Sequence, residues 1–146
     1  ANFRVLANKV AFVLLMAYCE ILIIDDDVDD IAILAEALTN RGVHNVHYVH
    51  TAMQAFMYLE TAKTSLPKLI VTDHHLAGIT GPEFLRDLKG MHLYDQIPVI
   101  VLSTIKSQKE IEDYKALGIL EYLEKPSTYE DYLKVAAEII AKLKDG

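Results

Sequence analysis

Carboxylates, a hydroxyl and a lysine stand where the apolar runs of this 146-residue chain end. Asp25 and Asp26 follow one run, Asp73 follows another, and Ser103 and Lys125 follow two later ones. Clustered carboxylates suit a hard, oxygen-seeking cation such as Mg²⁺. A carboxylate beside such a cation can attack phosphorus, while a lysine stabilises the charge of the transferring group. The residue types therefore point to aspartyl-phosphate chemistry centred on Asp73.

That chemistry requires the run ends to meet, and the order of elements predicts that they do. From residue 20 onward, apolar runs of strand length alternate with segments of helical periodicity. This alternation predicts an α/β fold, a doubly wound five-stranded parallel sheet with its ligand site at the carboxyl ends of the strands. The expected strands are 20–24, 46–49, 68–72, 99–102 and 119–123, and the expected helices are 29–40, 51–63, 83–89, 106–117 and 128–143.

Composition excludes several other classes of protein. Hydrophobic residues make up 52% of the chain, which argues against disorder. A net charge of −7 without a dense basic run argues against a nucleic-acid binder. The acidic loop from Asp25 to Asp30 lacks the glycines that would cradle a dinucleotide phosphate. The single cysteine, Cys19, excludes an internal disulfide and a cysteine-based zinc site, and it fits a reducing, cytoplasmic setting.

The first 19 residues form an extension ahead of a domain expected over residues 20–146. The apolar run from Val10 to Cys19 is too short to span a bilayer, and no small-x-small cleavage site follows it. Phe3, Leu6 and Val10 recur at helical spacing, which predicts an extra helix. The alternatives for this helix are packing on the domain, contact with a partner or a second copy in a homodimer, and an artefact of how the chain was expressed.

Taken together, residues 20 to 144 resemble the receiver domain of two-component response regulators, the CheY-like family with a flavodoxin-like fold. The family's sheet has the order 2-1-3-4-5. Each of its motifs has a counterpart at the expected spacing: the acidic pair at Asp25 and Asp26, the phosphoacceptor at Asp73, the hydroxyl residue at Ser103, the aromatic switch at Tyr122 and the lysine–proline pair at Lys125-Pro126.

The resemblance implies a role for each of these residues. Asp26 and Asp73 would bind Mg²⁺ directly, Asp25 would act through water, and the backbone carbonyl of His75 would be a further ligand. Asp73 would accept a phosphoryl group from phosphohistidine on a histidine kinase or a histidine phosphotransfer protein. Ser103 and Tyr122 would then move together. The surface formed by the helix 106–117, the strand 119–123 and the helix 128–143 would change its affinity for a downstream protein partner.

The chain also departs from the family pattern. Ala77 stands where the family usually has proline, and Thr104 where it favours a very small residue. His75 and Ile105 occupy the positions that line the mouth of the site, and Ile105 cannot position a water, which favours a long-lived phosphoryl state. The family's lysine–proline bond is usually cis, so the same is expected of Lys125-Pro126.

Two other functions compete with a phosphorylated switch. A haloacid-dehalogenase-type phosphatase also uses an aspartyl nucleophile and Mg²⁺, but it needs an aspartate two residues after the nucleophile, where this chain has His75. A degenerate receiver would serve only as a protein-interaction module, and the complete set of site residues argues against it. The pair His74-His75 resembles a transition-metal site, but adjacent residues on a strand end point in different directions.

Overall fold

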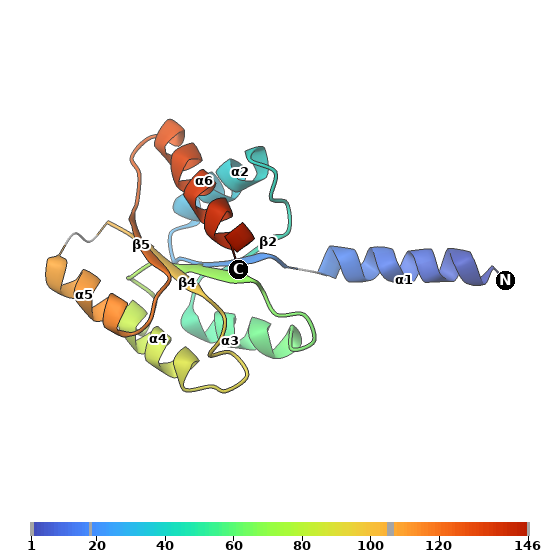
Figure 1. Ribbon diagram of the computed structural model, residues 1–146, viewed down its shortest axis with the longest axis horizontal. Coiled ribbons are helices and arrows are strands. Elements are labelled where there is room, and N and C mark those ends of the chain that lie inside the picture. Colours follow the sequence, from blue (N-terminus) through green and yellow to red (C-terminus); the bar gives the residue numbers. More distant parts are fainter. Residues whose placement is uncertain (1, 18, 105–106, 146) are drawn as a thin grey trace.

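One sheet of five parallel strands forms the centre of the computed structural model, which describes residues 2–17, 19–104 and 107–145. The strand order is β2-β1-β3-β4-β5, which confirms the predicted α/β class and the flavodoxin-like order (Figure 1). All four neighbouring pairs are parallel, so every strand delivers its carboxyl end to the same edge. The strands are β1 (Ile21–Ile24), β2 (Val46–Val49), β3 (Leu69–Thr72), β4 (Val99–Ser103) and β5 (Glu121–Glu124).

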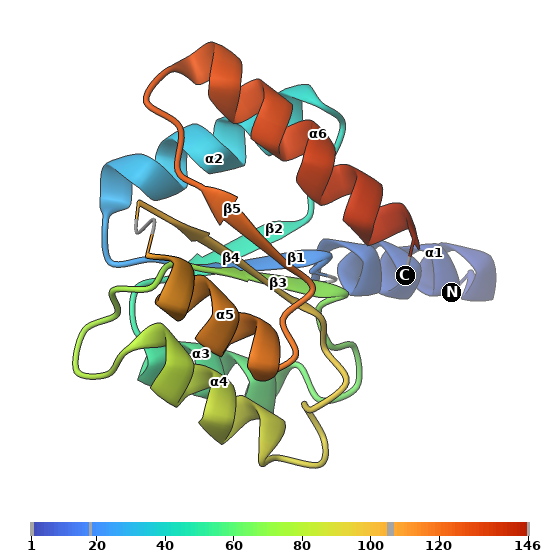
Figure 2. The same cartoon turned by 60° about the vertical axis from the view of Figure 1, so that its left-hand side comes forward.

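Helices cover both faces of this sheet. The helices α2 (Val28–Asn40) and α6 (Tyr129–Asp145) lie on one face. The helices α3 (Ala52–Thr61), α4 (Gly81–Lys89) and α5 (Gln108–Ala116) lie on the other (Figure 2). Every residue of β1, β3 and β4 is buried, as expected for strands covered on both sides.

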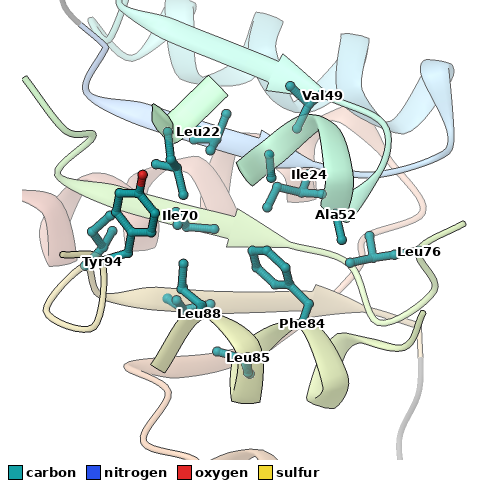
Figure 3. Packing of buried hydrophobic residues seen from close by; sticks show 14 of the residues in the cluster. Leu22, Ile24, Val49, Ala52, Ile70, Leu76, Phe84, Leu85, Leu88 and Tyr94 are labelled. Carbon is teal, nitrogen blue, oxygen red and sulfur yellow. The ribbon is translucent and has the colours of Figure 1, made fainter. Parts of the chain in front are cut away.

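The core consists of two apolar clusters, one on each face of the sheet. Side chains alternate across a strand, so Ile21 and Ile23 pack toward α2 and α6, whereas Leu22 and Ile24 pack toward α3 and α4. Figure 3 shows the second cluster, in which Phe84 of α4 lies against the strands. The rigid sheet between the two clusters fixes the positions of the residues at its carboxyl edge.

Local sequence signals set the ends of the helices. Asp27 caps α2, because its side chain accepts hydrogen bonds from the backbone N–H groups of Asp29 and Asp30. Thr80 caps α4 in the same way, and Pro82 occupies the first turn of that helix. Gly42 follows the end of α2 with a φ of +100°, a conformation that favours glycine. These residues fix the bounds of α2 and α4.

The bounds of several elements differ from the sequence-based expectation by one or two residues. The strand β5 begins at Glu121 instead of Ile119. Ile119 packs against the core ahead of the strand, and the N–H of Leu120 donates to the Val99 carbonyl at 2.8 Å. Within α5, where most side chains are charged or exposed, Tyr114 is completely buried. Lys106, the expected first residue of this helix, lies outside the described residues.

The N-terminal extension forms the predicted helix, α1 (Phe3–Ala17), but this helix is not packed on the domain. It projects away from the sheet and its covering helices (Figure 1). Phe3, Leu6 and Val10 are more than half exposed, so the apolar stripe that predicted packing faces outward at these positions. Across the part of the chain that the structure describes, no helix combines the length and apolarity that a bilayer crossing requires.

Candidate functional site

Three carboxylates meet at the carboxyl edge of the sheet, as the sequence predicted. Asp25 and Asp26 follow β1, and Asp73 follows the adjacent strand β3. The N–H of Asp73 donates to the Ile24 carbonyl at 2.9 Å, so the ladder between the two strands brings the carboxylates together. One oxygen from each of the three side chains lies within 4.8 Å of the others.

Burial makes this cluster electrostatically unfavourable by itself. Asp25 and Asp73 are only 5% and 7% exposed, whereas Asp26 is exposed. Burial raises the pKa of Asp25 to about 6, although hydrogen bonds from Lys125 and from the N–H of Asp27 act in the opposite direction. Burial therefore disfavours the ionised form of Asp25 despite the nearby Lys125 ammonium.

Lys125 is the cation at this edge, and it contacts three carboxylates. Its Nζ lies 2.8 Å from Asp25, 2.8 Å from Asp30 and 3.4 Å from Asp73. The side chain is 8% exposed. Burial alone would lower the pKa of Lys125, but its hydrogen bonds to Asp25 and Asp30 raise it above the ordinary value. The lysine is thus held as an ammonium beside the proposed nucleophile.

Asp30 is the site residue whose role sequence reasoning missed. It was identified only as part of an acidic helix start, yet its carboxylate accepts a hydrogen bond from Lys125. The available signal was helical spacing: Asp30 lies in the first turn of α2, three residues after the capping Asp27. That position aims a side chain back over the edge where β1 ends.

Ser103 and Tyr122 lie next to each other, as the proposed switch pair requires. Ser103 ends β4 and is completely buried, and its carbonyl accepts a hydrogen bond from the N–H of Lys125 at 2.9 Å. Burial raises the pKa of Tyr122, while a side-chain hydrogen bond with Ser103 opposes that shift. The two residues are therefore in direct contact between neighbouring strands, and their coupled movement stays a prediction.

The two histidines after Asp73 have different surroundings. The ring Nδ1 of His74 lies 2.5 Å from the Tyr114 hydroxyl, so this side chain is engaged by α5 and not by the acidic cluster. His75 is exposed and forms an isolated antiparallel bridge with Thr80. The use of the His75 carbonyl as a metal ligand stays a prediction.

Tyr114 depends on the absence of a side chain at Gly81. A Cβ built on Gly81 would lie 2.1 Å from the Tyr114 hydroxyl oxygen and 3.3 Å from the Cα of His74. Only glycine at the start of α4 lets the tyrosine reach the loop that follows Asp73.

The departures from the family pattern have mixed outcomes. Ala77 pairs with Thr51 in an isolated parallel bridge, which ties the loop to the chain just before α3. Thr104 is exposed, and Ile105 lies outside the described residues. The expected cis bond is wrong: the described residues contain no cis peptide, so Lys125-Pro126 is trans, the isomer favoured by about 0.5–1 kcal/mol for bonds to proline.

The donor set at this edge fits a small, hard divalent cation. The candidate ligands Asp25, Asp26 and Asp73 offer only oxygen atoms, which Mg²⁺ prefers. Burial holds the pKa of Asp25 above its ordinary value even though Lys125 acts in the opposite direction. Among the described residues, this is the one group of three or more potential ligands close enough to hold a metal ion. The residues present therefore match the predicted cation.

Comparisons with known proteins agree with this geometry. The model of the response regulator receiver domain family matches residues 21–137. The two-component response regulator ARR15 of Arabidopsis thaliana is 30% identical over 130 residues, which cover 84% of this chain and 62% of that protein. The chain thus spans less than two thirds of the length of this curated relative.

Solved structures show the same similarity. The phosphorylated cyanobacterial phytochrome response regulator RcpA is 31% identical, with a TM-score of 0.75 over 84% of this chain and 91% of the other. The Mn²⁺-bound response regulator Rcp1 is 25% identical, with a TM-score of 0.72 over 83% and 91%. With its five-stranded parallel fold and its acidic edge, this chain belongs to the response regulator receiver domain family of two-component signalling.

Proposed function

We propose that this chain is a phosphorylatable signalling switch whose acceptor is Asp73. The observation that carries the proposal is the position of the Asp73 carboxylate, which belongs to the candidate cation site and lies 3.4 Å from the Lys125 ammonium. A nucleophile, a metal site and a fixed cation are the components that phosphoryl transfer to a carboxylate requires. The donor would be a phosphohistidine on a histidine kinase or a histidine phosphotransfer protein in the cytoplasm.

In the transfer step, a carboxylate oxygen of Asp73 attacks the phosphorus atom. The bond between phosphorus and the histidine nitrogen breaks, and its electron pair stays on the imidazole. Asp25, Asp26, Asp73 and the His75 carbonyl would hold Mg²⁺, which supplies positive charge to the phosphoryl oxygens when bound. Lys125 donates to a phosphoryl oxygen, and the Ser103 hydroxyl donates to another once the group is in place.

The new charge would change the surface beside the site. Ser103 contacts Tyr122 in β5, so movement of the serine toward the phosphoryl group removes a partner from the tyrosine. Tyr122 lies between α5 and α6 along the chain, and the surface of α5, β5 and α6 would thereby change its affinity for a downstream protein. In this scheme the chain turns over no external substrate and loses its phosphoryl group only by transfer or hydrolysis.

Incubation with Mg²⁺ and acetyl phosphate tests this proposal. Intact-mass measurement is expected to show the addition of one phosphoryl group to the wild-type chain and none to Asp73→Asn. Asp87→Asn, an exposed carboxylate on α4, is the matched control and should react like the wild type. Removal of Mg²⁺ with EDTA is expected to abolish the modification.

The competing functions predict different results in the same experiment. Steady hydrolysis of a phosphate ester, without accumulation of a modified chain, would favour the phosphatase. A wild-type chain that gains no phosphoryl group from acetyl phosphate would leave only the protein-interaction module.

A further inference from the structure

The three carboxylates around Lys125 do not share its ammonium equally. Asp25 and Asp30 each lie 2.8 Å from Nζ, the distance of a strong charged hydrogen bond, whereas Asp73 lies 3.4 Å away. The ammonium therefore lies closer to Asp25 after β1 and to Asp30 in α2 than to the proposed nucleophile. An ammonium bonded closely to Asp73 would occupy the oxygen that must attack phosphorus.

Asp30 differs from the other two partners in its position. It lies outside the group of carboxylates that could hold a metal ion. Its backbone N–H donates to the Asp27 side chain at 3.1 Å, so the cap of α2 fixes the residue in the first turn. The Asp30 side chain is 31% exposed, compared with 8% for Asp25.

We propose that Asp30 is a positioning residue, which holds the Lys125 ammonium away from Asp73 so that the nucleophile stays open while the cation stays within reach. This inference rests on the proposed function of Asp73. Its basis is the combination of two short contacts and one long contact at a single buried Nζ.

The contact between Lys125 and Asp30 can also be kept during the reaction. Binding of a cation and formation of the phosphoryl ester both change Asp73, and the cation also draws on Asp25. Neither event changes Asp30, because this residue belongs to neither the cation site nor the reacting group. An ammonium has three N–H donors, so Lys125 can keep its bond to Asp30 while it donates to an arriving phosphoryl oxygen.

Truncation of Asp30 tests this role. In Asp30→Ala, phosphorylation by acetyl phosphate with Mg²⁺ is expected to slow by about tenfold, the smallest effect typical of losing a hydrogen bond to a charged group. Asp30→Asn keeps the shape of the side chain and should show a smaller loss in the same direction. Asp29→Ala is the control, because it removes the same charge from the neighbouring, exposed position in the same turn.

Mg²⁺ affinity, measured by isothermal titration, provides a readout that does not depend on phosphorylation. Without Asp30, the ammonium moves toward Asp25 and Asp73 and competes with the cation for their oxygens. Asp30→Ala is therefore expected to bind Mg²⁺ severalfold more weakly than Asp29→Ala. In a Lys125→Met background, which removes the competing cation, the difference between the two variants should disappear.

These measurements distinguish the inference from the proposed function. Equal behaviour of Asp30→Ala and Asp29→Ala would overturn the positioning role, and so would an Asp30→Ala effect that persists unchanged in Lys125→Met. A wild-type chain that takes no phosphoryl group would overturn the proposed function instead. The Mg²⁺ titrations would then still decide whether Asp30 controls the lysine.

Discussion

Along β3 and the residue that follows it, the buried side chains change from apolar to polar. Leu69, Ile70 and Val71 are apolar and at most 1% exposed, whereas Thr72 and Asp73 are polar and nearly as deeply buried. Burial of the apolar side chains stabilises the fold. Burial of Asp73, beside Asp25 and Lys125, removes charge from water and yields no comparable gain. The apolar interior therefore stabilises a fold in which charged groups are held close together at the carboxyl edge of the sheet.

The largest effect is expected in the interior. Leu38 of α2 is completely buried, and Leu38→Ala should lower the free energy of unfolding by about 2–5 kcal/mol, because the truncation leaves a cavity. Chemical denaturation monitored by circular dichroism measures the loss. Met53→Ala, at a 73% exposed position, is the control and should change stability by less than about 0.5 kcal/mol. A small loss at Leu38 would mean that the interior is not the main source of stability.

The second-largest effect is expected at the contact between Gly81 and Tyr114, which joins the apolar interior to the carboxyl edge. Gly81→Ala places a methyl group 2.1 Å from the Tyr114 hydroxyl, and this overpacking should cost about 1–3 kcal/mol. Helix propensity alone predicts the opposite sign, since alanine favours a helix over glycine by about 1 kcal/mol. Tyr114→Phe in the same chain removes the clashing oxygen and should restore part of the loss in a thermal unfolding experiment. Stabilisation by Gly81→Ala alone would refute this contact.

At the carboxyl edge, a substitution is expected to stabilise the chain. Asp25→Asn removes a buried charge whose pKa is raised to about 6, so at pH 7 without metal it should increase the free energy of unfolding, on the order of 1–3 kcal/mol. Denaturation in EDTA measures the change. Asp113→Asn, a carboxylate on the exposed side of α5, is the control and should have little effect. Destabilisation by Asp25→Asn would show that its bond to Lys125 outweighs its burial.

The same residue predicts how stability depends on pH. The folded pKa of Asp25, about 6, lies above the ordinary value of 3.8, so the folded chain binds more protons than the unfolded chain between these values. This contribution to stability is complete below about pH 4 and is lost as the pH rises through about 6. Denaturation series across this range, without metal, should show a decline that is weaker in Asp25→Asn. An identical decline in both chains would assign it to other groups.

The smallest effect is expected at the hydrogen bond between His74 and Tyr114, which joins the carboxyl edge to the apolar interior. Tyr114→Phe keeps the ring but removes the partner of His74, and it should cost about 0.5–1.5 kcal/mol, as is typical of a neutral hydrogen bond. Tyr48→Phe, at a 53% exposed position on the edge strand β2, is the control and should have no measurable effect. Thermal unfolding of the two variants in parallel separates the contributions.

Much of this arrangement could be predicted because one signal served two purposes. The apolar runs that end in Asp25 and Asp73 indicated buried strands and also located the acidic edge of the sheet. All strands of a parallel sheet end at the same edge, so the residue that follows each apolar run has a known place in the fold. The acidic cluster and Lys125 therefore meet as expected, and the offset of β5 did not move Lys125 away from them.

Contacts made by helices across the sequence could not be predicted in the same way. Tyr114 stands among charged residues of α5, and its burial depends on Gly81, which lies 33 positions earlier. Asp30 belongs to an acidic run in which several residues could have faced Lys125. Such contacts depend on how a helix is rotated against the sheet, and residue spacing within one element does not determine that rotation. The orientation of α1 away from the domain is a further case.

The helix α1 and the acidic cluster lie at opposite ends of β1. This helix leads into the amino end of β1, while Asp25 follows its carboxyl end, about 13 Å away along a strand of four residues. A segment joined at the amino edge can be lengthened, exchanged or tethered without touching the groups around Asp73. A change in the N-terminal helix and a change in the acidic cluster therefore act on opposite ends of the same strand, so either can be altered without disturbing the other.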